Sequence, residues 1–198
     1  MCHNFVRKSI VLRVFAAGFV LLMAFTCSSC GDSVSSDSTM TESLLNSYMK
    51  SFCDYNIGGM NRCCMANLDT FEDSDAIMKS CRSIAQRVEW ENLNVSIDGN
   101  SAIAQVRIIL PEDLEGLCRL ALNDTIKALD GGSDADFSAS LASAIKKRAG
   151  QAPTQEMSVE IHMTKVNNKW YIVKSLGVNR MISEIRTSVV AVFSIIGG

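Results

Sequence analysis

Two stretches of alternating apolar and polar residues constrain the fold of this chain more than any other feature of its sequence. In the first, apolar residues recur at every second position from Leu93 to Ile97, the chain turns at Asp98-Gly99-Asn100, and the alternation resumes from Ala102 to Leu110. Alternation with a period of two is typical of a half-buried strand, and the sequence Asp-Gly-Asn strongly favours a tight turn. We therefore predict a β-hairpin over residues 89–110.

The second alternating stretch lies later in the chain. Apolar and polar residues alternate from Met157 to Thr164, and the segment Trp170–Leu176 follows a turn at Asn167-Asn168-Lys169. The same reasoning predicts a second hairpin.

Helical patterns fill the chain before and between the hairpins. Apolar residues recur at steps of three and four in Thr41–Tyr55, which ends near Gly58-Gly59, and again from about Asp73 to Val88. Between the hairpins, Pro111 opens a helix that stops at Gly131-Gly132, and another runs from about Asp134 to Ala149. Two helices and a hairpin, repeated once, predict an α+β fold with a helical insertion between the hairpins.

The C-terminal segment carries a further apolar stripe. Its members recur at steps of four and three: Val178, Ile182, Ile185, Val189, Val192 and Ile196. We predict an extra C-terminal helix, although Val189–Ile196 alone also fits a strand. Phe193 and Ile195 widen the stripe, so three uses stay open: core packing, contact with a partner or second copy, and contact with a membrane.

The N-terminus has the parts of a secretory signal. Basic residues from Arg7 to Arg13 precede an apolar run from Val14 to Phe25, and small residues follow. Because the basic residues come first, the body of the protein is expected outside the cytoplasm. We expect this signal to be cleaved before Cys30. The alternatives are cleavage at another position and an uncleaved membrane span over Val14–Ser29.

The segment Ser28-Ser29-Cys30-Gly31 resembles the lipobox of bacterial lipoproteins. That resemblance implies that Cys30 is acylated and becomes the new N-terminus. We expect a signal peptide over residues 1–29, a flexible tether over 30–39 and a single α+β domain over 40–198. The tether is expected because its composition is dominated by serine, aspartate and threonine.

Paired helices ahead of antiparallel strands, closed by Val166-Asn167-Asn168-Lys169-Trp170-Tyr171-Ile172-Val173, resemble the nuclear-transport-factor-2-like (NTF2-like) or cystatin-like fold. This fold occurs in many uncharacterised bacterial lipoproteins, and the resemblance covers residues 40–176. It implies a curved antiparallel sheet that wraps a helix and leaves a conical pocket for catalysis, binding or subunit pairing. The insertion over 111–150 and the C-terminal helix are additions, and either one could fill that pocket.

Charge and motifs exclude several function classes. Residues 30–198 keep 16 of the 19 basic residues and all 21 acidic ones, so their formal net charge is −5 and nucleic acid is not an expected partner. No GxSxG, HExxH, P-loop or dinucleotide fingerprint occurs. We predict no cofactor and no metal site.

Three groups of reactive or charged residues have both a functional and a structural interpretation. His162 beside Glu160 could act as a general base, but its alternation with apolar residues is typical of a solvent-facing strand side. Lys146-Lys147-Arg148 fits the C-terminal dipole of a helix as well as contact with anionic lipid headgroups. Five cysteines follow Cys30, namely Cys53, Cys63, Cys64, Cys81 and Cys118. They indicate buried free thiols, one disulfide from Cys53 to Cys63 or Cys64, or a metal or redox site.

These observations predict an exported protein, anchored to a bacterial membrane by lipid on Cys30, whose domain is not an enzyme. It is expected to bind a small apolar ligand or an envelope protein. The residues expected to form apolar walls are Trp90, Met157, Met163, Trp170 and Tyr171, although such residues at strand spacing also fit plain core. The alternatives are an assembly subunit that dimerises through the sheet or the C-terminal helix, and an envelope enzyme.

Overall fold

The computed structural model describes residues 31–68, 71–130 and 136–195. The chain divides into two compact units, Met1–Val34 and Ser35–Gly198, and the second unit holds the sheet. Cys30 and the expected signal peptide lie outside the described residues, as does Ile196 of the C-terminal stripe.

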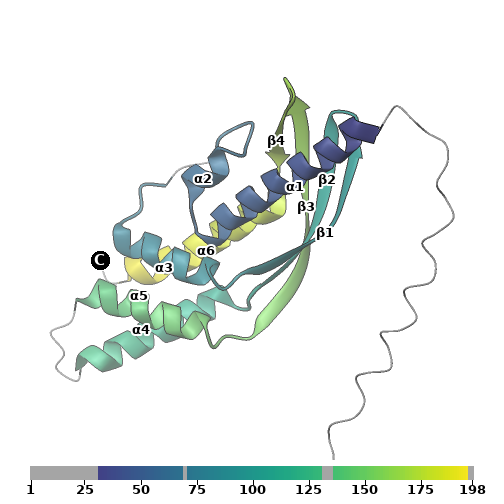
Figure 1. The fold of residues 1–198 in the computed structure, drawn as a ribbon. Coiled ribbons are helices and arrows are strands. Elements are labelled where there is room, and N and C mark those ends of the chain that lie inside the picture. Colours follow the sequence, from purple (N-terminus) through teal and green to yellow (C-terminus); the bar gives the residue numbers. More distant parts are fainter. Residues whose placement is uncertain (1–30, 69–70, 131–135, 196–198) are drawn as a thin grey trace, which may run out of the picture. The chain divides into compact units, whose positions relative to one another are not determined.

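Four strands form one antiparallel sheet in the order β1-β2-β3-β4 (Figure 1). They are β1 (Glu89–Asp98), β2 (Ser101–Pro111), β3 (Thr154–Val166) and β4 (Lys169–Lys174). The turn between β1 and β2 contains Gly99 at φ 55°, and the turn between β3 and β4 contains Asn167 and Asn168 at φ 49° and 63°. Positive φ values are what tight hairpin turns require. Both predicted hairpins are confirmed.

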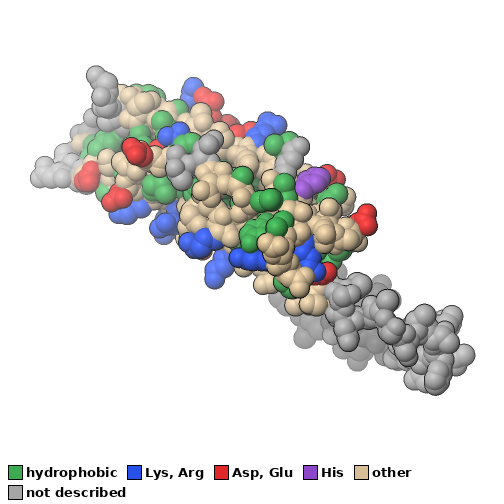
Figure 2. Space-filling model, turned by 90° about the horizontal axis from the view of Figure 1, so that it is seen from above, with side chains coloured by type: hydrophobic (Ala, Val, Ile, Leu, Met, Phe, Trp, Pro, Cys, Tyr) green, Lys and Arg blue, Asp and Glu red, His purple; other side chains and the backbone are tan. Residues whose placement is uncertain are grey.

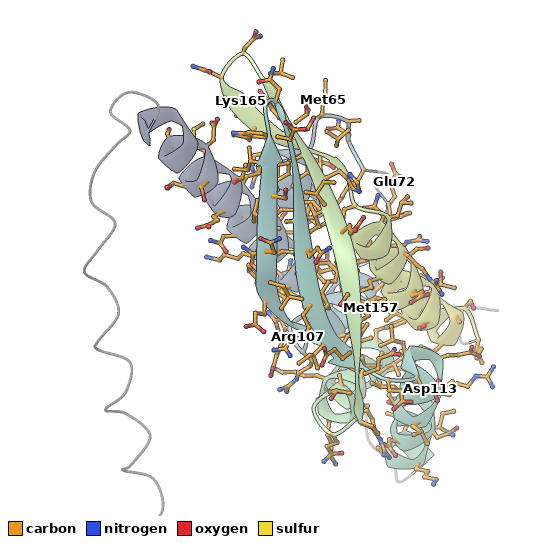
Figure 3. All side chains as sticks on the ribbon, turned by 90° about the vertical axis from the view of Figure 1, so that its right-hand side faces the viewer. Met65, Glu72, Arg107, Asp113, Met157 and Lys165 are labelled. Carbon is orange, nitrogen blue, oxygen red and sulfur yellow. The ribbon has the colours of Figure 1, made fainter. Side chains whose placement is uncertain are left out.

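The two faces of the sheet differ in polarity, as the alternation predicts. The inner face buries Ala104, Val106 and Ile108 of β2 beside Val159 and Ile161 of β3. On the outer face, Arg107 forms an ion pair with Glu91 and lies 3.9 Å from Glu156. Figure 3, seen from the sheet side, shows the strands in front of the helices, so the helices cover the inner face.

The described residues form six helices: α1 (Gly31–Cys53), α2 (Ile57–Asn61), α3 (Asp75–Ala85), α4 (Leu114–Asp130), α5 (Phe137–Ala149) and α6 (Leu176–Ser194). A single hydrophobic cluster joins α1, α3, α4, α5 and α6 to the inner face of the sheet. Helix α1 contributes four fully buried hydrophobic side chains to it, Leu45, Tyr48, Met49 and Phe52. Helices α4 and α5 pack side by side, α5 also packs on α3, and α4 on α6. The α+β fold with a helical insertion is therefore as predicted.

Helix α1 begins earlier than predicted. We expected a flexible tether over residues 30–39, but α1 starts at Gly31. Within this segment Asp37 accepts two hydrogen bonds from Lys165 Nζ, and at its end Thr41 is fully buried. These contacts, which the composition of the segment does not show, accompany a helix where a tether was expected.

The remaining differences concern α2 and α6. Helix α2 was not predicted, because Gly58-Gly59 is typical of a helix stop; Asn56 caps it by accepting a hydrogen bond from Gly59 N at 2.9 Å. Residues 189–194 belong to a helix and not to a strand. The apolar stripe of α6 is buried: Val178, Met181, Ile182, Ile185, Val189 and Val192. In the described part of the chain, no helix is long and apolar enough to cross a membrane.

Candidate functional site

Two hollows lie on the surface beside Arg148, at the end of the sheet where α4 and α5 pack together. Arg148 is in the last turn of α5 and lines both hollows. Helix α5 begins after Asp136, whose side chain accepts a hydrogen bond from Ser138 N at 2.9 Å, and ends at Gly150. The basic run Lys146-Lys147-Arg148 therefore stands where the helix dipole favours cations.

An ion pair between α4 and α5 orients Arg148. Its Nε and Nη2 donate hydrogen bonds to the two carboxylate oxygens of Asp124 at 2.6 and 2.7 Å. These bonds lower the pKa of Asp124, and the carboxylate raises the pKa of Arg148. A two-point pair fixes the plane of the guanidinium group. About a third of each side chain is exposed, so the pair contributes more to position than to stability.

The first hollow, of about 690 Å³, is lined mainly by residues of α4 and α5. Small residues of α5 form much of its lining: Ala139, Ser140, Ser143 and Ala144. Lys127, Lys147 and Arg148 face Asp124 and Asp136 in the same lining, so the charges nearly cancel. The apolar part of this lining comes mainly from small alanine side chains and lacks a large anchor residue, and its net charge is small.

The second hollow, of about 490 Å³, lies between the start of α4 and the segment that leads into β3. Its apolar lining consists of Leu117, Leu120, Ala152 and Pro153, and the exposed Glu112 and Asp113 also line it. The backbone hydrogen bond from Glu112 N to Pro153 O, at 2.8 Å, joins its two sides.

A local constraint shapes the start of α4 at this hollow. Asp113 has a φ of 49°, and its Oδ1 accepts a hydrogen bond from Gly116 N at 2.9 Å. A Cβ atom at position 116 would lie 2.1 Å from Asp113 Oδ2. Position 116 must therefore be glycine if the Asp113 side chain is to keep this conformation.

The two linings differ in the chemistry that they can support. Neither contains a histidine or a cysteine, so Ser140 and Ser143 lack the histidine partner that commonly activates a hydroxyl nucleophile. The second hollow combines a buried leucine, Leu117, and an exposed one, Leu120, with two carboxylates. Arg148 also lines it, but its guanidinium group is already paired with Asp124. The combination of leucines and carboxylates suits an apolar side chain that has a basic neighbour.

The hollows do not coincide with the conical pocket that the family resemblance implies. Neither lining includes a residue of α1 or of the four strands. Of the expected wall residues, Met163 and Trp170 are 2% exposed in the core, Trp90 and Met157 pack against the core, and Tyr171 is half-buried. Four of these five residues serve the core, Tyr171 being the exception, and sequence reasoning did not find the second hollow.

His162 and Glu160 lie on the outer face of the sheet. Their side chains are 42% and 59% exposed, and His162 Nε2 lies 3.6 Å from Glu160 Oε2. This placement agrees with the solvent-facing interpretation of the alternation. On the face seen in Figure 2, hydrophobic side chains are scattered between charged and polar ones.

All five cysteines in the described residues are free, so the structure contains no bond from Cys53 to Cys63 or Cys64. Burial raises the pKa of the thiols, to about 11 for Cys53 and Cys64 and to about 12 for Cys81 and Cys118. Such thiols are protonated at neutral pH and react slowly. Among the residues that the structure describes, no three His, Cys, Asp or Glu side chains are grouped to hold a metal ion.

No family model and no curated protein matches the chain. Among solved structures it is similar to an NTF-2-like protein of unknown function from Shewanella oneidensis MR-1, at 8% identity and a TM-score of 0.38, over 70% of this chain and 96% of that one. A protein of unknown function from Mycobacterium tuberculosis is similar at 10% identity and a TM-score of 0.36, over 81% of this chain and 90% of that one. A candidate lipoprotein of Bacillus subtilis is similar at 15% identity and a TM-score of 0.38, over 74% of this chain. The chain spans 46% of that last protein's length.

Proposed function

We propose that this protein is an exported, lipid-anchored lipoprotein whose non-catalytic domain binds an envelope protein through the second hollow. The observation that carries the proposal is Leu120, which is 50% exposed and lines the hollow beside the buried Leu117. Single exposed leucines are ordinary. An exposed leucine in a concave site with acidic neighbours has the composition of an interface anchor. The proposed occupant is an apolar side chain of the partner, next to a basic residue that faces Glu112 and Asp113.

A protein partner fits the second hollow better than a small apolar ligand does. Small-molecule sites enclose most of the ligand surface, whereas Leu120 and Pro153 of this lining are exposed to solvent. The inner face of the sheet, where an apolar ligand was expected, carries core side chains such as Ile108, Ile161 and Trp170. A folded partner needs only a shallow anchor point, because the rest of the contact spreads over the surface around it.

Two matched substitutions on α4 test the site. Leu120→Asp places a charge in the second hollow, and Ile126→Asp places the same charge at a residue that is 43% exposed and lines neither hollow. Because both side chains are exposed, each change should alter the free energy of unfolding by less than about 1 kcal/mol. In copurification from native membranes with quantitative mass spectrometry, Leu120→Asp alone should lose a partner by about tenfold or more. Equal recovery of every protein with both variants contradicts the proposal.

Assembly of identical copies has less support. The α6 stripe, considered above as a dimer surface, is buried within its own chain, and the outer sheet face carries the charged residues Glu91, Arg107 and Glu156. A native mass spectrum separates the two cases. A dimer that Leu120→Asp abolishes would identify the partner as a second copy of this chain.

The lipid anchor is proposed from Ser28-Ser29-Cys30-Gly31 and the basic, apolar segment before it. Metabolic labelling with a fatty acid should mark the wild-type protein and should be lost in Cys30→Ala, because the acyl chain is attached at that residue. Cys2→Ala, which removes a thiol that lies outside the lipobox, is the matched control and should keep the label. Equal labelling of the wild type and Cys30→Ala would exclude the lipobox.

A further inference from the structure

We infer that a short, pinned connection to the lipid fixes which end of the domain faces the membrane. The end that carries the two β-turns lies next to the bilayer, and the second hollow lies at the far end. This inference rests on the lipid at Cys30 that the proposed function includes. It starts from a cluster that we call the clamp: Asp37 of α1, Lys165 of β3 and Trp170 of β4.

Three hydrogen bonds hold Asp37 to the sheet in the clamp. Lys165 Nζ donates to Asp37 Oδ1 and Oδ2 at 2.6 and 2.9 Å, and Trp170 Nε1 donates to Oδ1 at 3.1 Å. The bond from Lys165 is the main cause of a lowered pKa of Asp37, so its carboxylate is charged at neutral pH. Only 19% of the Lys165 side chain and 15% of the Asp37 side chain are exposed. Charge-assisted bonds that are shielded from water hold their partners more firmly than surface pairs do.

The clamp and the second hollow lie at opposite ends of the sheet. Lys165 pairs with Trp170 beside the Asn167-Asn168 turn, and Lys165 N donates to Asn100 O in the β1–β2 turn at 2.8 Å. Pro153, in the lining of the second hollow, directly precedes β3. Figure 3 shows Lys165 and Asp113 at opposite ends of the strands. The strand from Thr154 to Lys165 spans about 36 Å at the usual rise per residue.

The connection from Cys30 to the clamp is too short for the domain to turn over. The seven residues from Cys30 to Asp37 span at most about 25 Å when fully extended. This length is smaller than the distance along β3 from the clamp to the second hollow. An anchored domain therefore keeps the clamp end near the bilayer and presents the second hollow to partners away from it.

Two native tryptophans report on the two ends. Trp170 is in the clamp, and Trp90 pairs with Ile108, which in turn pairs with Met157. Met157 lies about 26 Å along β3 from Lys165. Trp90→Phe keeps only the clamp tryptophan, and Trp170→Phe keeps only the distal one while leaving the pair of Lys165 with Asp37 in place.

The experiment uses the acylated protein in phosphatidylcholine vesicles that contain a lipid with a dansyl-labelled headgroup. Energy transfer from tryptophan to dansyl is measured for each single-tryptophan variant. Because transfer falls with the sixth power of distance, we expect several-fold more transfer from Trp170 than from Trp90. Asp37→Ala, added to each variant, should reduce this difference because it opens the clamp. Glu42→Ala, which removes the same charge from an exposed position of α1, should leave it unchanged.

The outcomes separate this inference from the proposed function. Equal or reversed transfer in acylated protein overturns the orientation and leaves the anchor standing. A protein that carries no fatty-acid label overturns the anchor and the orientation with it. Partner binding at the second hollow is judged independently, by Leu120→Asp against Ile126→Asp.

Discussion

At the scale of single residues, the pair Asp73 and Arg186 joins α6 to the segment before α3. Arg186 Nε and Nη2 donate to the two carboxylate oxygens of Asp73 at 2.9 and 2.8 Å, and the guanidinium carbon lies 4.2 Å from the centre of the Phe71 ring. The Asp73 side chain is only 4% exposed. A carboxylate with so little access to water depends strongly on its charged partner, whose hydrogen bonds replace the lost hydration.

We predict that Arg186→Ala lowers the free energy of unfolding by about 3–5 kcal/mol, since it leaves the buried Asp73 unpaired. Arg186→Lys keeps the charge but loses the two-point bond and the ring contact, so its loss should be intermediate. Urea unfolding followed by circular dichroism measures both.

Arg180→Ala is the control on the same helix. Its i,i+4 pair with Glu184 is largely exposed, and its removal should cost less than about 1 kcal/mol. If Arg186→Ala costs no more than this control, Asp73 does not depend on Arg186.

At the scale of elements, the strands could be predicted because their signals are local. Alternation gives the buried face of β2, and Gly99 and Asn167-Asn168 provide the turn conformations without any distant contact. The starts of α3 and α5 were predicted to within a few residues from apolar spacing. The caps that fix them, Ser74 and Asp136, are also local, because each accepts a hydrogen bond from an amide two or three residues ahead.

The start of α1 could not be predicted in this way. Asp37 and its partner Lys165 are 128 residues apart in the sequence, and the serine-rich composition around Asp37 contains no trace of that contact. A prediction from composition considers only how a segment interacts with water, and ignores its contacts with distant residues. It therefore takes no account of a part-buried charge pair such as that of Asp37 and Lys165.

The second hollow was missed because it forms only when α4 meets the chain just before β3. One signal could have pointed to it. Leu120 falls outside the apolar stripe of its helix, which includes Leu117 and Ala121, so it had no core position to occupy. Ile126 follows Leu122 by four residues, at helical spacing, and is nonetheless 43% exposed. Apolar spacing alone therefore does not separate core from surface on this helix.

At the scale of the whole molecule, one core spans the sheet and the helices, and α6 is part of it. Six buried side chains of α6 join this core, and the helix packs against α3, α4 and β3. Burial of six such side chains contributes roughly 9–18 kcal/mol. The net stability of a domain is only about 5–15 kcal/mol, so the rest of the core should not fold without α6.

We therefore predict that a chain ending at Gly177 loses its cooperative unfolding transition and its native circular dichroism. A point variant tests the same reasoning in the complete chain: Ile185→Asp, at a fully buried position, should unfold the protein, because it places a charge in the core. Leu176→Asp, on the same helix at a residue that is 66% exposed, should unfold at the wild-type urea concentration. A truncated chain that stays folded and monomeric would contradict this account. In that case α6 would be an added element whose apolar stripe is free to meet a partner.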